Sequence, residues 1–210
     1  INFHASLLPD YRGAAPINWV IINGEKITGV STFFINENID TGDIIDQRTV
    51  KIDILDSYGD LFHKLKKIGA DLVLNTVNNI IGGKIDLKPQ INIPNLNSAN
   101  KLNKENCRID WSMNASNIYN KIRGLSPYPG ANCFLVHGNE TLKIIIYSSK
   151  IEIETHQLGS GQIIIEKKQI KIATKDGFLI PQEIKVQGKK SMKISDLMNG
   201  FKFDLSSKFI

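Results

Sequence analysis

The chain has 210 residues, 41% hydrophobic and 22% charged, a composition that excludes a disordered or fibrous protein. It holds no apolar run long enough to span a bilayer, and its two cysteines lack metal-ligand spacing, so we interpret them as reduced cytoplasmic thiols. The net charge of +5 is uneven: residues 1–100 hold 9 Lys/Arg and 11 Asp/Glu, whereas 101–210 hold 17 and 10. The basic half favours a polyanionic partner, although an ordinary lysine-rich surface would give the same count.

The first half alternates strand-like and helix-like segments. Pro16 lies in the first turn of a short helical segment, and a loop over 36–44 is rich in Asn, Asp and Gly. We expect, in chain order, a strand end over 1–5, a helix over 14–23, strands over 29–35 and 44–52, and a long helix capped by Asp56 or Ser57 and stopped by Gly82 and Gly83. A strand, a crossover helix, two strands and a long helix indicate an α/β fold. A doubly wound sheet needs more βαβ units, and we expect two or three of them ahead of Ile1.

A segment without sustained periodicity divides the chain. Residues 87–106 are rich in Asn, Pro and Lys, so we interpret them as a linker between a domain over 1–86 and a second domain over 107–210. After a helix over 114–123, short strand-like runs are separated by the turn sequences HGNE, KKQ and KDG, and one more short helix is expected over 191–201. Strands at this spacing predict a small β-barrel.

Asn2 and His4 are the first candidates for chemistry. Side chains alternate in a strand, so the two share one face, where an amide donor and an imidazole could converge on an oxygen that becomes an oxyanion. A polar pair at a strand end would have the same pattern. A carboxylate near His4 would hold its tautomer. Asp40, in the loop between two predicted strands, is our candidate. Its competitors are Asp43, which could support the turn, and Asp46, which alternates outward on the next strand.

The residues after this strand could form a binding turn and supply a positively charged side chain. Ser6 to Pro9 would form a rigid, partly apolar turn whose exposed main-chain groups could hold a flat heterocycle, although an ordinary turn fits as well. Arg12 could meet a phosphate or a carboxylate, or lie in a surface loop. The sequence contains no phosphate-binding loop and no Gly-x-Ser-x-Gly motif, and no other histidine has a ligand partner at useful spacing. We therefore expect no metal.

The motifs of both halves fit one pattern. Asn-x-His, Ser-Leu-Leu-Pro and the later Asp together strongly resemble the formyltransferases that use 10-formyltetrahydrofolate. Tyr-Arg-Gly-Ala-Ala-Pro and Ile-Asp-Thr-Gly-Asp-Ile look most like the branch of that family that formylates methionyl-tRNA. Arg-Ile-Asp-Trp-Ser, Leu-Ser-Pro-Tyr-Pro-Gly and Gly-Lys-Lys-Ser-Met in the second half agree. The resemblance covers almost the whole chain.

This resemblance implies a fold and an activity. The fold is the C-terminal part of a Rossmann-like formyltransferase domain followed by a small OB-like barrel. The activity is transfer of a formyl group from 10-formyltetrahydrofolate to the α-amino group of initiator methionyl-tRNA, in translation initiation. We expect a cytoplasmic monomer without membrane contact. The family's elements that precede Ile1 also help to hold folate and tRNA.

The resemblance also implies which residues act. The catalytic positions of the family fall on Asn2, His4 and Asp40. Its folate-contacting turn falls on four consecutive residues, Ser6, Leu7, Leu8 and Pro9. The barrel would help to bind tRNA through lysine–phosphate contacts, which are sensitive to salt. Our candidates for tRNA contacts are Arg12, Lys167, Lys168, Lys185, Lys189 and Lys190.

Other functions stay open at this point. A folate-dependent formyltransferase acting on glycinamide ribonucleotide or on an amino sugar shares the Asn-x-His pattern. The basic second half argues against the first of these, and the Ile-Asp-Trp-Ser motif argues against both. A formyltetrahydrofolate hydrolase fits less well. A different class is a non-catalytic RNA-binding remnant, which gains support if the chain begins at Ile1 in the cell.

Overall fold

The computed structural model describes residues 1–91, 94–204 and 206–210. The chain divides into two compact units, Ile1–Leu102 and Asn103–Ile210. This division falls inside the segment 87–106 in which the sequence favours a linker. Within the described residues, no helix combines the length and the apolar character needed to cross a membrane.

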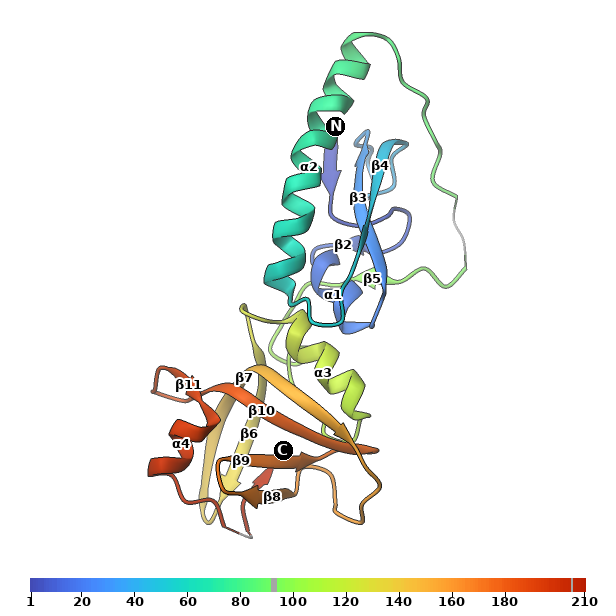
Figure 1. The fold of residues 1–210 in the computed structure, drawn as a ribbon. Coiled ribbons are helices and arrows are strands. Elements are labelled where there is room, and N and C mark those ends of the chain that lie inside the picture. Colours follow the sequence, from blue (N-terminus) through green and yellow to red (C-terminus); the bar gives the residue numbers. More distant parts are fainter. Residues whose placement is uncertain (92–93, 205) are drawn as a thin grey trace. The chain divides into compact units, whose positions relative to one another are not determined.

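A small antiparallel sheet forms the centre of the described first unit (Figure 1). Its strands, in spatial order, are β1 (Asn2–His4), β3 (Ile27–Phe33) and β4 (Ile44–Lys51). The register places Asn2 opposite Phe33 and His4 opposite Ser31. The predicted crossover helix is therefore wrong. The helix α1 (Pro16–Ile22) links two antiparallel neighbours, whereas a crossover joins parallel strands.

The long helix α2 (Tyr58–Ile81) packs along this sheet (Figure 1). It begins with a capping box, because the Ser57 hydroxyl accepts from the Asp60 amide at 3.2 Å and the Asp60 carboxylate accepts from the Ser57 amide at 3.0 Å. Gly69 lets the helix approach β1: a Cβ there would lie 2.5 Å from Cζ of Phe3. The helix is followed by Gly82 at its C-cap, as predicted.

Apolar side chains from both helices and the sheet fill the core of the first unit. The cluster comprises Tyr11, Val20, Ile21, Val30, Ile52, Leu61, Leu65, Leu72 and Ala99. Ala99 comes from β5 (Ser98–Ala99), which pairs in parallel with β2 (Arg12–Gly13). Only glycine fits at Gly13, where φ is +124° and a Cβ would lie 2.5 Å from the Ala99 carbonyl oxygen. Part of the expected linker is thus built into the first unit.

The second unit is a larger, antiparallel sheet with helices packed on it. Its described strands follow the order β12-β6-β7-β10-β9-β8, with β11 paired to β10. The elements are α3 (Ala115–Gly124), β6 (Ala131–His137), β7 (Glu140–Ile153), β8 (Ile163–Glu166), β9 (Gln169–Ala173), β10 (Gly177–Val186), β11 (Ser191–Lys193), α4 (Ile194–Gly200) and β12 (Lys208–Phe209). The strand β7 pairs with β6 through residues 140–146 and with β10 through residues 144–153, so that its middle part lies between the two.

The two ends of this sheet meet. Gln162, directly before β8, forms an isolated antiparallel bridge with Lys208 of β12, and the Phe209 amide donates to the Gly161 carbonyl at 2.9 Å. A Cβ at Gly161 would lie 1.9 Å from the Phe209 carbonyl oxygen, so this approach requires glycine. The strand β10 has an irregularity beside Pro181, a residue that cannot donate to a ladder. The sheet therefore curves round until its edges are joined.

Candidate active site

His4 is a buried histidine whose two ring nitrogens both face polar partners. It ends β1 and is 6% exposed. Its Nε2 donates to the Tyr11 carbonyl at 2.9 Å, and its Nδ1 lies 3.5 Å from Oδ2 of Asp40. Asp40 is thus the loop aspartate that reaches His4. Its competitors lie elsewhere: the Asp43 carbonyl closes the turn with the Phe34 amide, and Asp46 pairs with Arg48 at 3.2 Å.

The two residues that hold His4 have an unusual backbone. Tyr11 has φ of +58° and Asp40 has φ of +53°, in the left-handed region that residues with a side chain rarely occupy. Asp40 is also fixed through its carboxylate, since the Gly13 amide donates to Oδ2 at 3.0 Å. Local backbone strain of this kind is typical of functional sites, where the surrounding structure over-determines the conformation.

The Tyr11 side chain is anchored deep in the first unit. Its hydroxyl donates to Oε1 of Glu25 at 2.8 Å and accepts from Nδ2 of Asn23 at 3.0 Å. Burial of the ring raises the pKa of Tyr11 above its ordinary value, and the nearby Glu25 carboxylate adds to this shift. The hydroxyl therefore stays protonated at neutral pH, and the backbone carbonyl that binds His4 belongs to a fixed residue.

Asn2 lies on the same strand face as His4 but is exposed. Its Oδ1 accepts from the Phe3 amide at 3.0 Å, and within the described residues its Nδ2 donates to no protein group. The amide can therefore offer a donor to a bound molecule. His4 differs, because a substrate oxygen would have to replace the Tyr11 carbonyl as the acceptor of Nε2–H.

The turn Ser6–Pro9 is held by hydrogen bonds from β3 and β4. The Ser31 hydroxyl donates to the Ser6 carbonyl at 2.6 Å and accepts from the Leu8 amide at 3.1 Å, while Nε2 of Gln47 donates to the Leu8 carbonyl at 3.0 Å. The expectation of freely exposed main-chain groups is wrong for these three, because they already have partners inside the unit. The binding of a heterocycle by this turn stays a prediction. Sequence reasoning missed Ser31 and Gln47, which no local pattern marks.

Arg12 is bound to a residue far away in sequence. Its Nε and Nη2 both donate to Oε1 of Gln90, at 3.1 and 2.7 Å. The guanidinium is half-buried, so an RNA contact by Arg12 stays a prediction in which Gln90 would be a neighbour. Sequence reasoning did not single out Gln90.

The lysines proposed from the sequence lie on the surface of the second unit. They occupy the turn between β8 and β9, the strand β10 and the turn between β10 and β11: Lys167, Lys168, Lys185, Lys189 and Lys190. All five are exposed, and none forms an ion pair with another described residue. Their positive charge is therefore available to an anion, but the structure does not single out one of them.

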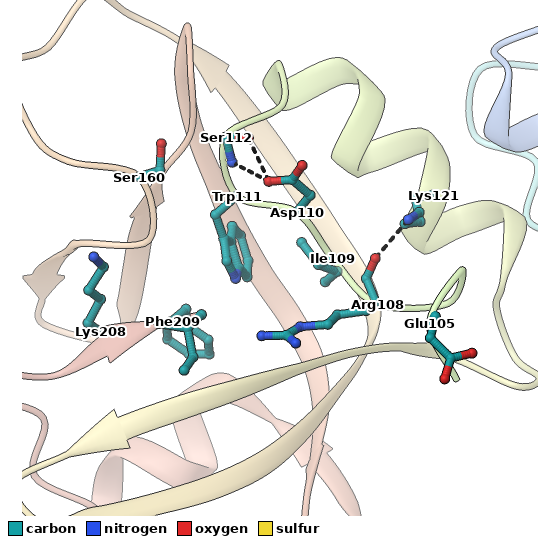
Figure 2. Close-up of a pocket in the computed structure, with 11 residues that line it drawn as sticks. Glu105, Arg108, Ile109, Asp110, Trp111, Ser112, Lys121, Ser160, Lys208 and Phe209 are labelled. Carbon is teal, nitrogen blue, oxygen red and sulfur yellow. Dashed lines mark hydrogen bonds between the residues drawn. The ribbon is translucent and has the colours of Figure 1, made fainter. Parts of the chain in front are cut away.

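A cavity of about 510 Å³ lies elsewhere in the second unit (Figure 2). Cations and acids both line it, among them Arg108, Asp110 and Lys121. Nζ of Lys121 donates to the Arg108 carbonyl at 2.7 Å, and burial lowers the pKa of Lys121. Trp111 is 4% exposed and meets Phe209 edge to face, with ring centroids 5.7 Å apart. The proposed lysines do not line this cavity, and its mixed charge favours no single class of ligand.

Metal binding finds no support in side-chain clusters. Among the described residues, no three His, Cys, Asp or Glu side chains gather as a ligand set. Cys107 and Cys133 are free and buried, and burial raises the pKa of both thiols. They are therefore neutral at physiological pH.

Two family models match the chain. The first, "Formyl transferase", covers residues 1–77, and the second, "Formyl transferase, C-terminal domain", covers residues 101–202. The chain belongs to the formyl transferase family. Its fold is that of the family, with a Rossmann-like first part and a C-terminal domain.

Individual members of the family are similar to this chain over most of its length. Methionyl-tRNA formyltransferase of Flavobacterium johnsoniae is 47% identical over 99% of this chain and 66% of that protein, and its counterpart in Phocaeicola vulgatus is 41% identical over the same shares. The chain thus spans about two thirds of the length of these relatives. An N-formyltransferase of Helicobacter canadensis, solved with folinic acid and dTDP-3-aminofucose, is 27% identical, with a TM-score of 0.66 over 86% of this chain and 64% of that one.

Proposed function

We propose that the chain takes part in transfer of a formyl group from 10-formyltetrahydrofolate to the α-amino group of methionine on initiator methionyl-tRNA. The observation that carries the proposal is the pairing of His4 with Asp40, whose carboxylate lies 3.5 Å from Nδ1 of His4, on a strand that has Asn2 on the same face as His4. The identity of 41–47% to methionyl-tRNA formyltransferases supports this choice of acceptor.

The candidate residues can stabilise the negative charge that develops during such a transfer. The neutral methionine amine attacks the formyl carbon, a C–N bond forms, and negative charge grows on the formyl oxygen. Nδ2 of Asn2 and Nε2–H of His4 would donate to that oxygen once His4 releases the Tyr11 carbonyl. The intermediate collapses as the bond from carbon to N10 of the folate breaks. The amine loses a proton to Asp40, directly or through water, and N10 gains one.

The folate would lie beside the turn Ser6–Pro9. The turn is rigid, since Ser31 and Gln47 hold its main chain and the Leu8 side chain is buried against Phe33 and Ile44, and it presents the half-buried apolar side chain of Leu7. Rigid apolar walls with a few polar groups are typical of sites for flat heterocycles. The folinic acid in the Helicobacter canadensis relative supports a folate co-substrate.

The second unit would supply affinity for tRNA. We infer that its sheet, whose ends are joined by the bridge between Gln162 and Lys208, is the OB-like barrel that the resemblance implies. The five candidate lysines, all exposed, would contact phosphates and give salt-sensitive binding. A cytoplasmic location and a monomeric state stay predictions.

The experiment that tests the proposal compares acceptors. The longest protein that the gene encodes is incubated with 10-formyltetrahydrofolate and with charged initiator methionyl-tRNA, glycinamide ribonucleotide or a dTDP-amino sugar in turn. We expect N-formylmethionyl-tRNA, and at most a trace of the other products. Preferred formylation of the amino sugar, the acceptor type suggested by the Helicobacter canadensis relative, would replace the proposal with that function. Binding of tRNA without any transfer would leave an RNA-binding protein.

A further inference from the structure

The segment after α2 is more than a connection. Residues 88–91 and 94–100, which we call the strap, lie against the loops that carry the candidate active site. Lys88 exchanges two backbone hydrogen bonds of 2.9 Å with Ile44, the first residue of β4, and the Asn97 amide donates to Asp10 at 2.7 Å. The strap is therefore attached near one end to the start of β4, directly after the Asp40 loop, and near the other end to the loop that follows β1.

Gln90 of the strap uses both ends of its side chain. Its Nε2 donates to the Asp40 carbonyl at 3.0 Å and to the Gly42 carbonyl at 2.7 Å, and its Oε1 accepts from both Nε and Nη2 of Arg12. A primary amide has two N–H donors and two acceptor lone pairs, so these four bonds use its full capacity. A residue in this role cannot be replaced by another without losing bonds.

These bonds fix the backbone of Asp40 and of the residues that follow it. The carbonyl groups on both sides of Thr41 are fixed by Gln90, while Gly42 approaches so closely that a Cβ would lie 1.6 Å from the Phe34 carbonyl oxygen. The Gly13 amide holds the Asp40 carboxylate, and Arg12, next to Gly13, holds Gln90. The left-handed φ of Asp40 thus sits in a closed ring of hydrogen bonds between the strap and two loops.

We propose that Gln90 is a positioning residue for Asp40: by binding the Asp40 and Gly42 carbonyls, it keeps the Asp40 carboxylate directed at Nδ1 of His4. This inference rests on the proposed function, because Gln90 affects the reaction only through the role of Asp40 in formyl transfer. Misplacement of a reacting group by about 1 Å can lower a rate roughly 100-fold, so the loss of this attachment has a measurable effect.

The test is a double-mutant cycle in the longest protein that the gene encodes. Gln90→Met removes both donors and the acceptor without adding a charge, and Asp40→Asn removes the carboxylate. We expect Gln90→Met to lower the single-turnover rate of formyl transfer by about 10- to 100-fold. The KM values for folate and tRNA and the melting temperature should change little. In the Asp40→Asn background, Gln90→Met should change the rate less than about twofold, because two changes that act through one group are not additive.

Three controls make the outcomes distinct. Asn97→Ala alters a strap side chain that contacts Asp10 and not Asp40, and it should leave the rate unchanged. Gln90→Glu keeps an acceptor for Arg12 but loses both donors, and it should resemble Gln90→Met. An equal loss of rate from Gln90→Met in the wild-type and Asp40→Asn backgrounds, or a wild-type rate in Gln90→Met, would overturn the inference while leaving the proposed function in place. A wild-type rate in Asp40→Asn alone would overturn the inference and the role of Asp40 in the transfer, whereas the absence of any formyl transfer in the wild-type protein would overturn the proposed function.

Discussion

The first unit concentrates its candidate chemistry in a few buried, mutually bonded residues, whereas the second spreads charge over exposed ones. His4 and Asp40 have fixed partners at stated distances, and even the backbone around them is fixed. The proposed lysines of the second unit have no ion-pair partner among the described residues, and they lie in separate turns and strands. The first unit thus fixes the positions of its candidate catalytic groups, and the second presents positive charge spread over its surface.

This difference indicates how each unit responds to substitution. Chemistry that depends on geometry is lost when a single donor is removed, because nothing else occupies its position. Affinity that depends on phosphate contacts declines in steps, since each lysine contributes a similar, salt-screened share. Variants in the first unit should therefore change rates, and variants in the second should change binding.

The largest effect is expected at Asn2. In Asn2→Ala the free Nδ2 donor is lost, and the single-turnover rate of formyl transfer should fall about 10²- to 10³-fold. Asn2→Asp keeps the size but not the donor and should lose as much. His63→Ala, an exposed histidine on α2, is the matched control and should retain the wild-type rate. A wild-type rate in Asn2→Ala would remove this residue from the site.

The second effect concerns salt. When Lys167, Lys168, Lys185, Lys189 and Lys190 are all changed to Ala, the plot of log K against log salt for tRNA binding should flatten by about 0.7–0.9 per lysine that contacts a phosphate. The transfer rate from the bound complex should be unaffected. Lys66→Ala with Lys67→Ala, on α2 of the first unit, controls for the loss of charge. An unchanged slope would contradict tRNA binding by these lysines.

A third prediction concerns the loop that carries Asp40. In Gly42→Ala the new Cβ would lie 1.6 Å from the Phe34 carbonyl oxygen, so the loop must move. We expect the free energy of unfolding to fall by about 1–3 kcal/mol and the transfer rate to fall with it. Gly200→Ala is the control, since its Cβ would meet no atom within 4 Å, and it should change stability by less than about 0.5 kcal/mol. Equal stabilities of the two variants in thermal melts would refute the packing of this loop.

The smallest effect is expected at the start of α2. Ser57→Ala removes the capping box and should lower stability by about 1 kcal/mol. Hydrogen bonds from Ser57 lower the pKa of Asp60 below its usual value. A lowered folded-state pKa stabilises the protein above the ordinary value of about 3.9, and this contribution is lost as the pH falls through the lowered one. The difference between wild type and variant should therefore be largest near neutral pH and shrink below about pH 4. A difference that grows in acid would contradict the cap.

Sequence patterns predicted the parts of the fold that local physics determines. The helix α2 follows a regular apolar spacing between a capping box and a glycine pair, and strand alternation placed Asn2 and His4 on one face. The pairing of strands that are distant in sequence could not be predicted from such patterns. The antiparallel pairing of β1 with β3, which overturned the crossover, depends on how the chain turns back through the loop and α1. Strands of two residues, such as β2, β5 and β12, leave no periodic signal.

The residues proposed to take part in the chemistry could be named from the sequence, but the residues that hold them in position could not. Residue patterns left three aspartates open, the family resemblance implied Asp40, and the structure confirms that Asp40 reaches His4. Gln90, Ser31 and Gln47 escaped notice because they act through side-chain bonds to distant backbone carbonyls, and such bonds follow no period in the sequence. The strap looked like a linker for the same reason. Its composition is that of a loop, and its contacts come from single side chains.

The central claim is that the first unit does the chemistry and the second holds the tRNA. It is tested most directly by measuring, side by side, the single-turnover transfer rate and the tRNA Kd of His4→Ala and of the five-lysine variant. We predict that His4→Ala lowers the rate at least about 100-fold with a Kd near that of wild type, and that the lysine variant does the reverse. A near-wild-type rate in His4→Ala, or a loss of rate with unchanged Kd in the lysine variant, would contradict the account.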